Sequence, residues 1–189
     1  RDKNITILVV ISGGKDSAVL LERIHENLGK RRDVTIVGGC VDEGIEGYRP
    51  PSLECARELC ESLGVRFETV SYPELGFKEM DDVVKKIADS KDNKTPCSYC
   101  GVFRRQGINH LAKRVGADVI ALGHNLDDMA QTIMMNMQNG DLERTLRLAP
   151  HTSTPLEGMA PRIVPLRWVP EQEIHLYALH KNLPIHHEE

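Results

Sequence analysis

A glycine-centred turn near the start of the chain gathers residues suited to holding an anion. The segment Ser12-Gly13-Gly14-Lys15-Asp16-Ser17 follows the apolar run Ile7–Ile11 and precedes residues with apolar side chains at helical spacing. The two glycines remove Cβ atoms where the backbone bends, and the free N–H groups and positive dipole end of the following helix would face an anion. Lys15 adds a positive charge, and the hydroxyls of Ser12 and Ser17 add donors. The turn therefore predicts a phosphate-binding loop.

This loop matches neither of the two common phosphate signatures. A G-x-x-x-x-G-K-[ST] loop fails because Val9 stands five residues before Gly14 and Asp16 replaces the magnesium-binding Ser or Thr. A G-x-G-x-x-G fingerprint fails because Gly13 and Gly14 are adjacent. Asp16 is the one carboxylate in the loop, and its natural use is to hold Mg²⁺ between itself and the phosphates.

Strand and helix patterns alternate along the chain. The continuous apolar run 7–11 is typical of a strand buried on both faces of a parallel sheet. We expect further strands at 34–41, 65–70 and 119–122 and one beginning at Leu183, with helices from 16 or 17 and at 52–63, 80–89, 100–115, 127–137, 142–148 and 171–181. A polar loop at 91–96 and an irregular stretch at 150–165 complete the chain. This order predicts an α/β fold with a doubly wound, mostly parallel sheet.

Three loops should meet at one edge of that sheet. The loop 12–17, the turn Asp42-Glu43-Gly44 and the loop Gly123-His124-Asn125 all follow predicted strands, so they are expected to open onto one crevice. Asp127 and Asp128 begin the next helix there. The helix dipole explains Asp127 as a cap, but two carboxylates in succession exceed what capping needs. We predict that Asp128 works in the site, as a magnesium ligand or as a proton acceptor.

A cysteine pair and an arginine share the start of another predicted helix. Cys97-Ser98-Tyr99-Cys100 is a C-x-x-C motif, which suits a redox pair, half of a zinc site or part of an iron–sulfur site. A thioredoxin-type motif directly follows a strand, whereas a polar loop precedes this one. Arg104 heads a helical stripe with Ile108, Leu111 and Val115, and Cys100 lies one turn earlier on the same face. An arginine on an inward-facing row needs an anion, and phosphate or sulfide would serve.

Length and composition suit one α/β domain in the cytosol. A chain of 189 residues can bury one sizeable core, and no apolar stretch or charged start has the form of a membrane span or signal peptide. The sequence begins at Arg1 and ends at Glu189 without terminal features, so we expect a fragment of a longer protein. Five cysteines, an odd number, favour reduced thiols or metal ligands over a disulfide scaffold.

The charge distribution gives no general support for nucleic-acid binding. The net charge is −4, whereas nucleic-acid enzymes usually carry a basic footprint. Local basic clusters partly offset this balance: Lys30-Arg31-Arg32, Arg104-Arg105, Lys113-Arg114, Arg144 with Arg147, and Arg162 with Arg167. Met134, Met135 and Met137 are expected in the core, with a homodimer face as the alternative.

The motifs resemble those of a known family. The hexad 12–17 resembles the SGGxDS pyrophosphate loop of the PP-loop ATPases, which grip the β- and γ-phosphates of ATP while the α-phosphate is attacked. Four further segments are similar to the tRNA 2-thiolation branch of that family, the cytosolic tRNA thiolation protein 1 and thermophile 2-thiouridine synthetase type. They are VDEGIEGYRPPSLECA at 41–56, PCSYCGVFRR at 96–105, ALGHNLDDMAQT at 121–132 and VPLRWVPEQEIHLYA at 164–178.

The resemblance implies a single PP-loop ATPase catalytic domain over 1–189, of the adenine-nucleotide α-hydrolase type, that uses ATP and Mg²⁺ on tRNA. In such a mechanism a uridine O2 attacks the α-phosphate, pyrophosphate leaves, and sulfide displaces AMP from C2. The implied ATP-binding residues are Ile11, Ser12, Gly13, Gly14, Lys15, Asp16, Ser17, Asp42, Gly123, His124 and Asp128. The implied catalytic residues are Lys15, Asp16, Arg104 and Asp128. The family often has lysine at the position of Arg104, which keeps the charge but changes the donor geometry.

The resemblance also implies a 4Fe-4S cluster that leaves one iron open to carry sulfide. Cys97 and Cys100 match two of its ligands, and the third cysteine and the family's zinc-binding segments are expected beyond this sequence, the cysteine after Glu189. A persulfide on one cysteine fits the pair equally well. The sulfur donor would be a ubiquitin-like thiocarboxylate protein or inorganic sulfide. Two alternatives stay open: an adenylating PP-loop synthetase without sulfur chemistry, and a non-catalytic nucleotide- or zinc-binding module.

Overall fold

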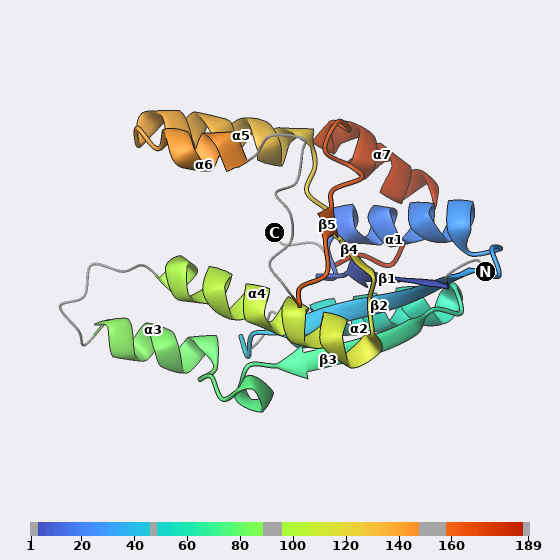
Figure 1. Cartoon of the computed structure of the whole chain (residues 1–189), viewed down its shortest axis with the longest axis horizontal. Coiled ribbons are helices and arrows are strands. Elements are labelled where there is room, and N and C mark those ends of the chain that lie inside the picture. The colour runs from blue at the N-terminus through green and yellow to red at the C-terminus, as the bar shows by residue number, and fades with distance from the viewer. Residues whose placement is uncertain (1–3, 46–48, 89–95, 148–157, 187–189) are drawn as a thin grey trace.

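Five parallel strands form the centre of the protein (Figure 1). The computed structural model describes residues 4–45, 49–88, 96–147 and 158–186. The strands are β1 (Ile5–Val10), β2 (Val34–Asp42), β3 (Arg66–Ser71), β4 (Val119–Ala121) and β5 (Arg162–Ile163), in the order β3-β2-β1-β4-β5. Every neighbouring pair is parallel. The sheet confirms the predicted α/β class.

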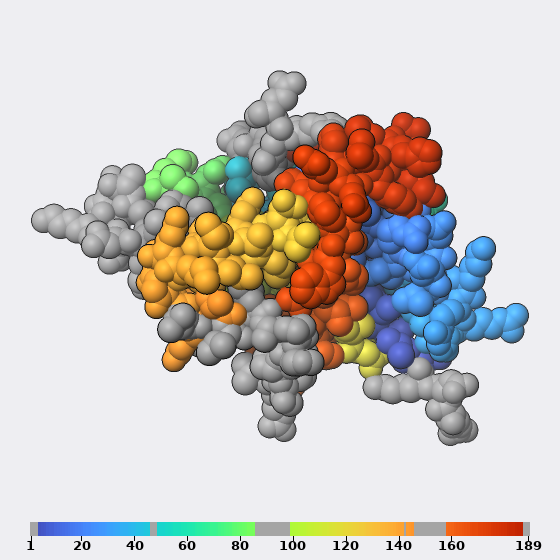
Figure 2. Space-filling view, turned by 90° about the horizontal axis from the view of Figure 1, so that it is seen from above, coloured from blue at the N-terminus to red at the C-terminus, as the bar shows by residue number. Residues whose placement is uncertain are grey.

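Helices cover both faces of the sheet. They are α1 (Lys15–Leu28), α2 (Arg49–Ser62), α3 (Met80–Ala88), α4 (Pro96–Val115), α5 (Leu126–Gln138), α6 (Leu142–Arg147) and α7 (Glu171–His180), with a short 3₁₀ helix η1 at Pro73–Leu75. Successive side chains of a strand point to opposite faces. Accordingly, Val9 packs in one core with α1, α2 and α7, whereas Leu8 packs in the other with α3 and α4. Figure 2 shows α7 lying beside α1.

The end of the described chain is not a strand, so the prediction of a strand beginning at Leu183 is wrong. Residues 183–186 have no strand structure. Instead, the backbone N–H of Leu183 donates to the carbonyl of Ala178, and that of His186 donates to the carbonyl of Gly13 at 2.8 Å. The segment after α7 therefore returns to the predicted phosphate loop instead of joining the sheet.

Other element boundaries also differ from the sequence analysis. The strand β5 falls inside the stretch 150–165 that was expected to be irregular. It has only two residues and is fixed by pairing with β4, with Arg162 opposite Ile120. Helix α4 begins at Pro96 rather than at 100, α2 begins at Arg49 rather than at 52, and α1 begins at Lys15. Residues 91–95 of the predicted polar loop lie outside the described residues.

The methionines of α5 do not lie in the core, contrary to expectation. Met134, Met135 and Met137 are 60%, 54% and 65% exposed. Helices α5 and α6 extend beyond the sheet (Figure 1), so most of the α5 surface has no layer to pack against. The homodimer face stays a prediction. Within the described ranges, no helix combines the length and apolar character needed to cross a membrane.

Candidate active site

The loop between β1 and α1 has the tight geometry that its glycines predict. Gly13 has φ +94°, and a Cβ atom there would lie 2.3 Å from the carbonyl oxygen of Ser52. Ser17 Oγ donates to the carbonyl of Gly14 at 3.1 Å and accepts from the N–H of Ser12 at 3.1 Å. Ser12 Oγ accepts from the N–H of Gly14 at 3.3 Å. The two hydroxyls thus brace the loop itself, in addition to the anion-binding role predicted for them.

Lys15 is engaged by carboxylates beside the loop. Its Nζ lies 2.7 Å from Glu171 Oε1 and 3.5 Å from Asp16 Oδ2. Burial alone would lower the pKa of Lys15, but the hydrogen bond to Glu171 and the charge of Asp16 outweigh it, so the pKa is raised. Lys15 therefore stays protonated and also ties the start of α1 to the start of α7.

A cleft of about 350 Å³ opens at the carboxyl ends of the central strands. It gathers most of the predicted site residues from the β1–α1 loop, the β4–α5 loop and helix α4. These residues are Ile11, Ser12, Asp16, Ser17, Arg104, Gly123, His124 and Asp128. Four other predicted residues are neighbours in sequence of lining residues but do not line the cleft themselves: Gly13, Gly14, Lys15 and Asp42. The cleft is also lined by Glu43 and Arg49, which were not predicted as site residues.

Asn125 joins two of the predicted carboxylates. Its Nδ2 donates to Asp16 Oδ1 at 2.8 Å. Its Oδ1 accepts from the N–H of Asp128 at 2.9 Å, and Asp128 Oδ2 accepts from the N–H of Asn125 at 3.0 Å. This reciprocal pair is a capping box for α5. Asp16 and Asp128 are thereby held on the wall of the same cleft.

Asp127 has a different partner from the one expected. The sequence analysis explained it as the cap of its own helix, but Asn125 and Asp128 fill that role in α5. Asp127 Oδ2 instead accepts from the backbone N–H of Glu171 at 2.7 Å. Glu171 is the first residue of α7, so Asp127 satisfies a free N–H at the start of that helix and fixes α7 against α5.

The turn after β2 sends Glu43, and not Asp42, into the cleft. Asp42 Oδ1 accepts from the N–H of Gly44 at 3.0 Å, which stabilises the turn. Glu43 is 3% exposed and contacts two arginines: its Oε2 lies 2.8 Å from Arg49 Nε, and its Oε1 lies 2.9 Å from an Arg104 terminal nitrogen. Sequence reasoning missed Glu43 because a shift of one residue at the strand end exchanges which side chain faces the site.

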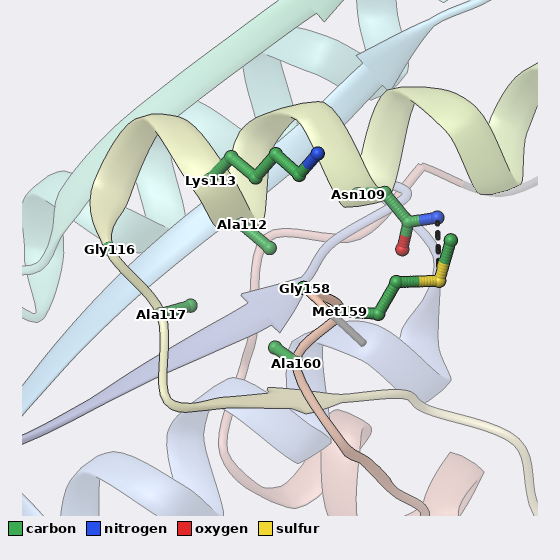
Figure 3. Close-up of a pocket in the computed structure, with 8 residues that line it drawn as sticks. All are labelled: Asn109, Ala112, Lys113, Gly116, Ala117, Gly158, Met159 and Ala160. Atoms are coloured by element: carbon green, nitrogen blue, oxygen red, sulfur yellow. Dashed lines mark hydrogen bonds between the residues drawn. The ribbon is translucent and has the colours of Figure 1, made fainter. Parts of the chain in front are cut away.

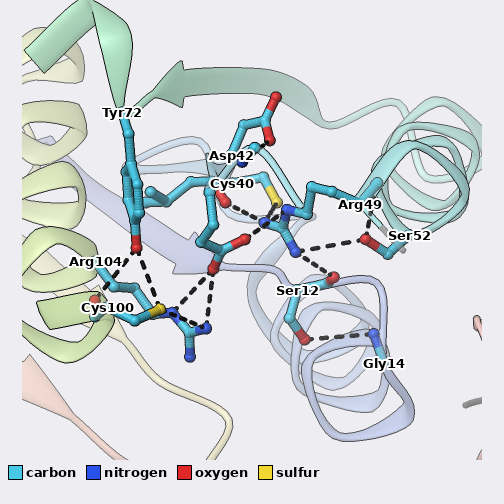
Figure 4. A network of polar contacts seen from close by, with 12 residues as sticks. Ser12, Gly14, Cys40, Asp42, Arg49, Ser52, Tyr72, Cys100 and Arg104 are labelled. Carbon is cyan, nitrogen blue, oxygen red and sulfur yellow. Dashed lines mark hydrogen bonds and ion pairs between the residues drawn. The ribbon is translucent and has the colours of Figure 1, made fainter. Parts of the chain in front are cut away.

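Arg104, on α4, lines the other side of the cleft, whereas Cys100, one turn earlier on the same helix, does not line it (Figure 4). An Arg104 terminal nitrogen lies 3.8 Å from Cys100 Sγ. Ile108 and Leu111 are buried as the stripe predicts, whereas the Arg104 side chain is 54% exposed. Burial lowers the pKa of Arg104, but the charge of Glu43 outweighs that effect and raises it. Within the protein, the anion that Arg104 meets is the carboxylate of Glu43, and its contact with phosphate or sulfide stays a prediction.

Tyr72 contacts Cys100 through its hydroxyl group. Its hydroxyl lies 3.2 Å from the carbonyl oxygen of Cys100 and 3.4 Å from Sγ. Its ring packs edge-on against Phe103, with ring centroids 5.4 Å apart. Burial and the contact with Cys100 both raise the pKa of Tyr72, so the phenol is neutral and can donate a hydrogen bond.

Cys97 lies in the first turn of α4, one turn before Cys100, and the structure does not describe its side chain. Among the side chains that the structure describes, no group of three or more His, Cys, Asp or Glu is arranged to hold a metal ion. Burial raises the pKa of Cys40 to about 11 and that of Cys60 to about 12, so both are unreactive core thiols.

Some arginines of the basic clusters form ion pairs with acidic side chains, and others have no acidic partner among the described residues. Arg31, Arg114 and Arg144 each contact an acidic side chain. Arg105 and Arg162 have no acidic partner in the described part of the chain; Arg162 donates to Asn109 Oδ1 at 3.0 Å. Burial first, and then the nearby charge of Arg105, lowers the pKa of Arg162. Two like charges thus lie close together on the α4–β5 side of the molecule.

A small pocket of about 120 Å³ lies on the same side (Figure 3). The last turns of α4 and the segment 158–160 form its walls, mostly from glycine and alanine. Asn109 and Lys113 supply polar groups at its rim, and Asn109 Nδ2 contacts Met159 Sδ at 3.9 Å. Lys113, like Arg105, has no acidic partner among the described residues.

A parallel α/β sheet with an anion-binding loop after its central strand defines a nucleotide-binding domain of the α/β class. The sequence profile of the PP-loop domain family matches residues 1–188. The chain belongs to the PP-loop domain family.

Several known proteins are similar to this chain. The tRNA 2-thiolation protein NcsA of Haloferax volcanii is 41% identical over 187 residues, which is 96% of this chain and 57% of that protein. Cytoplasmic tRNA 2-thiolation protein 1 of Drosophila virilis is 40% identical over 179 residues, 94% of this chain and 51% of that protein. The chain thus spans about half the length of these relatives.

Solved structures show the same fold. The U34-tRNA thiolase NcsA from Methanococcus maripaludis, solved with its [4Fe-4S] cluster, has a TM-score of 0.84 and 34% identity, over 98% of this chain and 59% of that one. The NH3-dependent NAD synthetase of Campylobacter jejuni has a TM-score of 0.58 and 17% identity, over 97% of this chain and 66% of that one, and shows the shared fold alone.

Proposed function

We propose that this chain is the catalytic domain of an ATP-dependent tRNA sulfurtransferase, which adenylates the C2 oxygen of a uridine and replaces that oxygen with sulfur. One observation carries the proposal: the phosphate loop and Arg104 line one cleft, contacts through Arg49 and Glu43 connect them, and Cys100 Sγ lies 3.8 Å from a terminal nitrogen of Arg104. A sulfur-bearing group and an ATP tail bound there would reach the same base. Relatives named tRNA 2-thiolation proteins support the same reaction.

The residues 12–17 would hold the β- and γ-phosphates. Backbone N–H groups at the start of α1 face the loop. The ammonium group of Lys15, which stays protonated because its pKa is raised, adds positive charge beside the loop. Asp16 and Asp128, joined by Asn125, would hold Mg²⁺, which would offset the negative charge of the phosphates. Ile11, Gly123 and His124 line the neighbouring wall, where the rest of the nucleotide would lie. Asp42 would act indirectly, by shaping the turn that carries Glu43.

Arg104 is the group best placed to stabilise the phosphate under attack. When the uridine O2 attacks the α-phosphate and pyrophosphate leaves, negative charge develops on oxygens in the cleft, and a fixed cation there lowers the barrier. The guanidinium lies at the cleft wall and stays charged. Asp128 has one of two roles: the Mg²⁺ ligand described above, or the carboxylate that accepts a proton during the exchange.

Cys97 and Cys100, with a third cysteine outside this sequence, would hold the 4Fe-4S cluster. The surroundings of Cys100 fit a thiolate ligand, since the Tyr72 hydroxyl and the Arg104 guanidinium both lie beside its Sγ. When bound, the cluster supplies a site for the sulfur that replaces the uridine oxygen. Inorganic sulfide or a ubiquitin-like thiocarboxylate protein would provide that sulfur, and the family's zinc sites would lie in other segments.

The tRNA would approach along the α4–β5 side. Arg105, Lys113 and Arg162 offer positive charge that no acidic side chain of the described residues neutralises, and phosphate contacts of this kind position RNA. A cytoplasmic location follows the name of the Drosophila virilis relative. The exposed methionines of α5 are the face that a homodimer would use.

The test uses the full-length protein, purified without oxygen and incubated with ATP, sulfide and tRNA. We expect bound iron and acid-labile sulfide, and 2-thiouridine in the tRNA by mass spectrometry. Cys100→Ser should abolish thiolation, whereas Cys55→Ser, a control away from the cleft, should not. A Cys100→Ser variant that keeps full activity would instead favour an adenylating synthetase without sulfur chemistry. A protein that never consumes ATP would favour a non-catalytic module.

A further inference from the structure

A buried carboxylate connects the two halves of the cleft. Glu43 lies between the guanidinium groups of Arg49 and Arg104, and its side chain is 4% exposed. Its Oε2 lies 2.8 Å from Arg49 Nε. Its Oε1 accepts from Arg104 Nε at 3.0 Å and lies 2.9 Å from a terminal nitrogen of the same guanidinium. One carboxylate therefore fixes two cations with different surroundings.

Arg49 is buried, and both of its terminal nitrogens contact other groups of the protein. One of its terminal nitrogens donates to the carbonyl of Ser12 at 3.1 Å, and the other contacts Cys40 Sγ at 2.9 Å and the carbonyl of Val41. Its side chain is 5% exposed. These contacts anchor Arg49 to the phosphate loop and to the end of β2. Arg49 therefore fixes the position of Glu43 relative to the loop.

Arg104 has few other constraints. Its side chain is 54% exposed, and its contacts in the described chain are Glu43 on one side and Cys100 Sγ on the other. A long, exposed arginine normally populates several rotamers, and fixing it in one costs side-chain entropy. The contact with Glu43 selects one orientation before any ligand arrives.

Stability alone does not explain this arrangement. Burying an ion pair is a weak source of stability, because desolvation offsets most of the attraction between the charges. Arg49 would suffice to neutralise Glu43, yet Oε1 of Glu43 is directed at a second, exposed arginine on the cleft wall. A carboxylate aimed at a cation in a cleft serves to place that cation.

We propose that Glu43 is a positioning residue: it holds the Arg104 guanidinium over the cleft and, through Arg49, sets its position relative to the phosphate loop. The inference rests on the proposed function only in that Arg104 acts on the phosphate under attack. The geometric part, an Arg104 oriented by Glu43, does not depend on which reaction the cleft performs.

The test compares Glu43→Gln with the unsubstituted full-length protein in tRNA-dependent pyrophosphate release. We expect kcat to fall roughly ten- to a hundredfold, because misplacing a catalytic group by about 1 Å has effects of that size. The KM for ATP should stay within about twofold, since the loop residues that bind ground-state phosphate are unchanged. Glu68→Gln is the matched control, because Glu68 also contacts two arginines, Arg66 and Arg114, away from the cleft.

A double-mutant cycle separates positioning from a general loss of structure. Arg104→Met should itself lower kcat, and adding Glu43→Gln to it should cause little further loss if Glu43 acts through Arg104. Fully additive losses, or a Glu43→Gln variant with unchanged kcat, would overturn the proposal. If the single variant fails to fold because Arg49 is left unpaired, the same cycle is run in an Arg49→Met background, where Glu43→Gln leaves no buried arginine without its carboxylate.

A crystal structure of Glu43→Gln supplies a readout that needs no activity. We expect the Arg104 guanidinium to leave the position it has beside Glu43 and Cys100. An Arg104 that stays in place would overturn the inference. If the unsubstituted protein shows no tRNA-dependent pyrophosphate release, the proposed function fails, and this crystallographic comparison still decides the positioning role.

Discussion

The two adjacent glycines of the phosphate loop should respond very differently to alanine. Gly13 has φ +94°, and its added Cβ would lie 2.3 Å from the carbonyl oxygen and 2.8 Å from the carbonyl carbon of Ser52. The backbone strain costs about 1–3 kcal/mol, and the displaced backbone of α2 costs about 1–3 kcal/mol more. Gly13→Ala should therefore destabilise the fold by about 2–6 kcal/mol and lower Tm by at least about 4 °C.

Gly14 is the internal control for this prediction. Its φ is −85°, and an added Cβ would meet only Ser12 Oγ at 3.5 Å, an ordinary contact. Gly14→Ala should change the free energy of unfolding by less than about 0.5 kcal/mol. It should still weaken ATP binding, because a methyl group would project from the loop where the phosphates approach.

Urea unfolding followed by circular dichroism measures the first effect, and calorimetric titration with ATP measures the second. The expected pattern is a stability loss confined to Gly13→Ala and an affinity loss with normal stability in Gly14→Ala. Equal stability of the two variants would refute the loop geometry. Normal ATP affinity in Gly14→Ala would refute the placement of the phosphates on this loop.

Three further predictions concern the surroundings of the cleft. Asn125→Ala should destabilise the protein by about 1 kcal/mol, because the N-cap of α5 is lost. It should also weaken magnesium-dependent ATP binding, because Asn125 no longer holds Asp16. Thermal melting with and without Mg-ATP measures both effects. Arg105→Gln should reduce the slope of log K against log salt for tRNA binding by about 1 in filter binding, whereas Arg66→Gln on the far strand should not. Because the pKa of Lys15 is raised in the folded protein, its protonated form stabilises the fold at pH values below the unfolded-state pKa of about 10.4. This stabilisation is lost as the pH rises through the folded-state pKa of Lys15. Glu171→Gln should therefore reduce the alkaline loss of stability in melts above pH 10, and an unchanged pH profile would contradict the ion pair.

Patterns that depend on neighbouring residues were readable from the sequence. The apolar run at 7–11 and the SGGKDS turn fixed the strand, the loop and the helix because each signal is local. The strand-to-loop order then placed Asp16, Gly123 and Asp128 at one edge of a parallel sheet, and the cleft contains all three. Topology rules carried this step, since the carboxyl ends of parallel strands share an edge.

Features that depend on tertiary contacts were not readable. Glu43 and Asp42 are adjacent in the same turn, and only the register of β2 decides which of them faces the cleft. Met134 and Met137 follow a helical pattern typical of a core, but α5 extends past the sheet and leaves them in solvent. The two-residue strand β5 is set by its pairing with β4, which no local pattern announces.

In the proposed reaction, a uridine oxygen attacks the α-phosphate of ATP in this cleft. Isotope transfer tests it directly, in one turnover of the full-length protein with ATP, sulfide and tRNA that carries ¹⁸O at C2 of its uridines. The account predicts that ¹⁸O appears in the phosphate of AMP, in an amount equal to the 2-thiouridine formed. AMP that contains only ¹⁶O would contradict it.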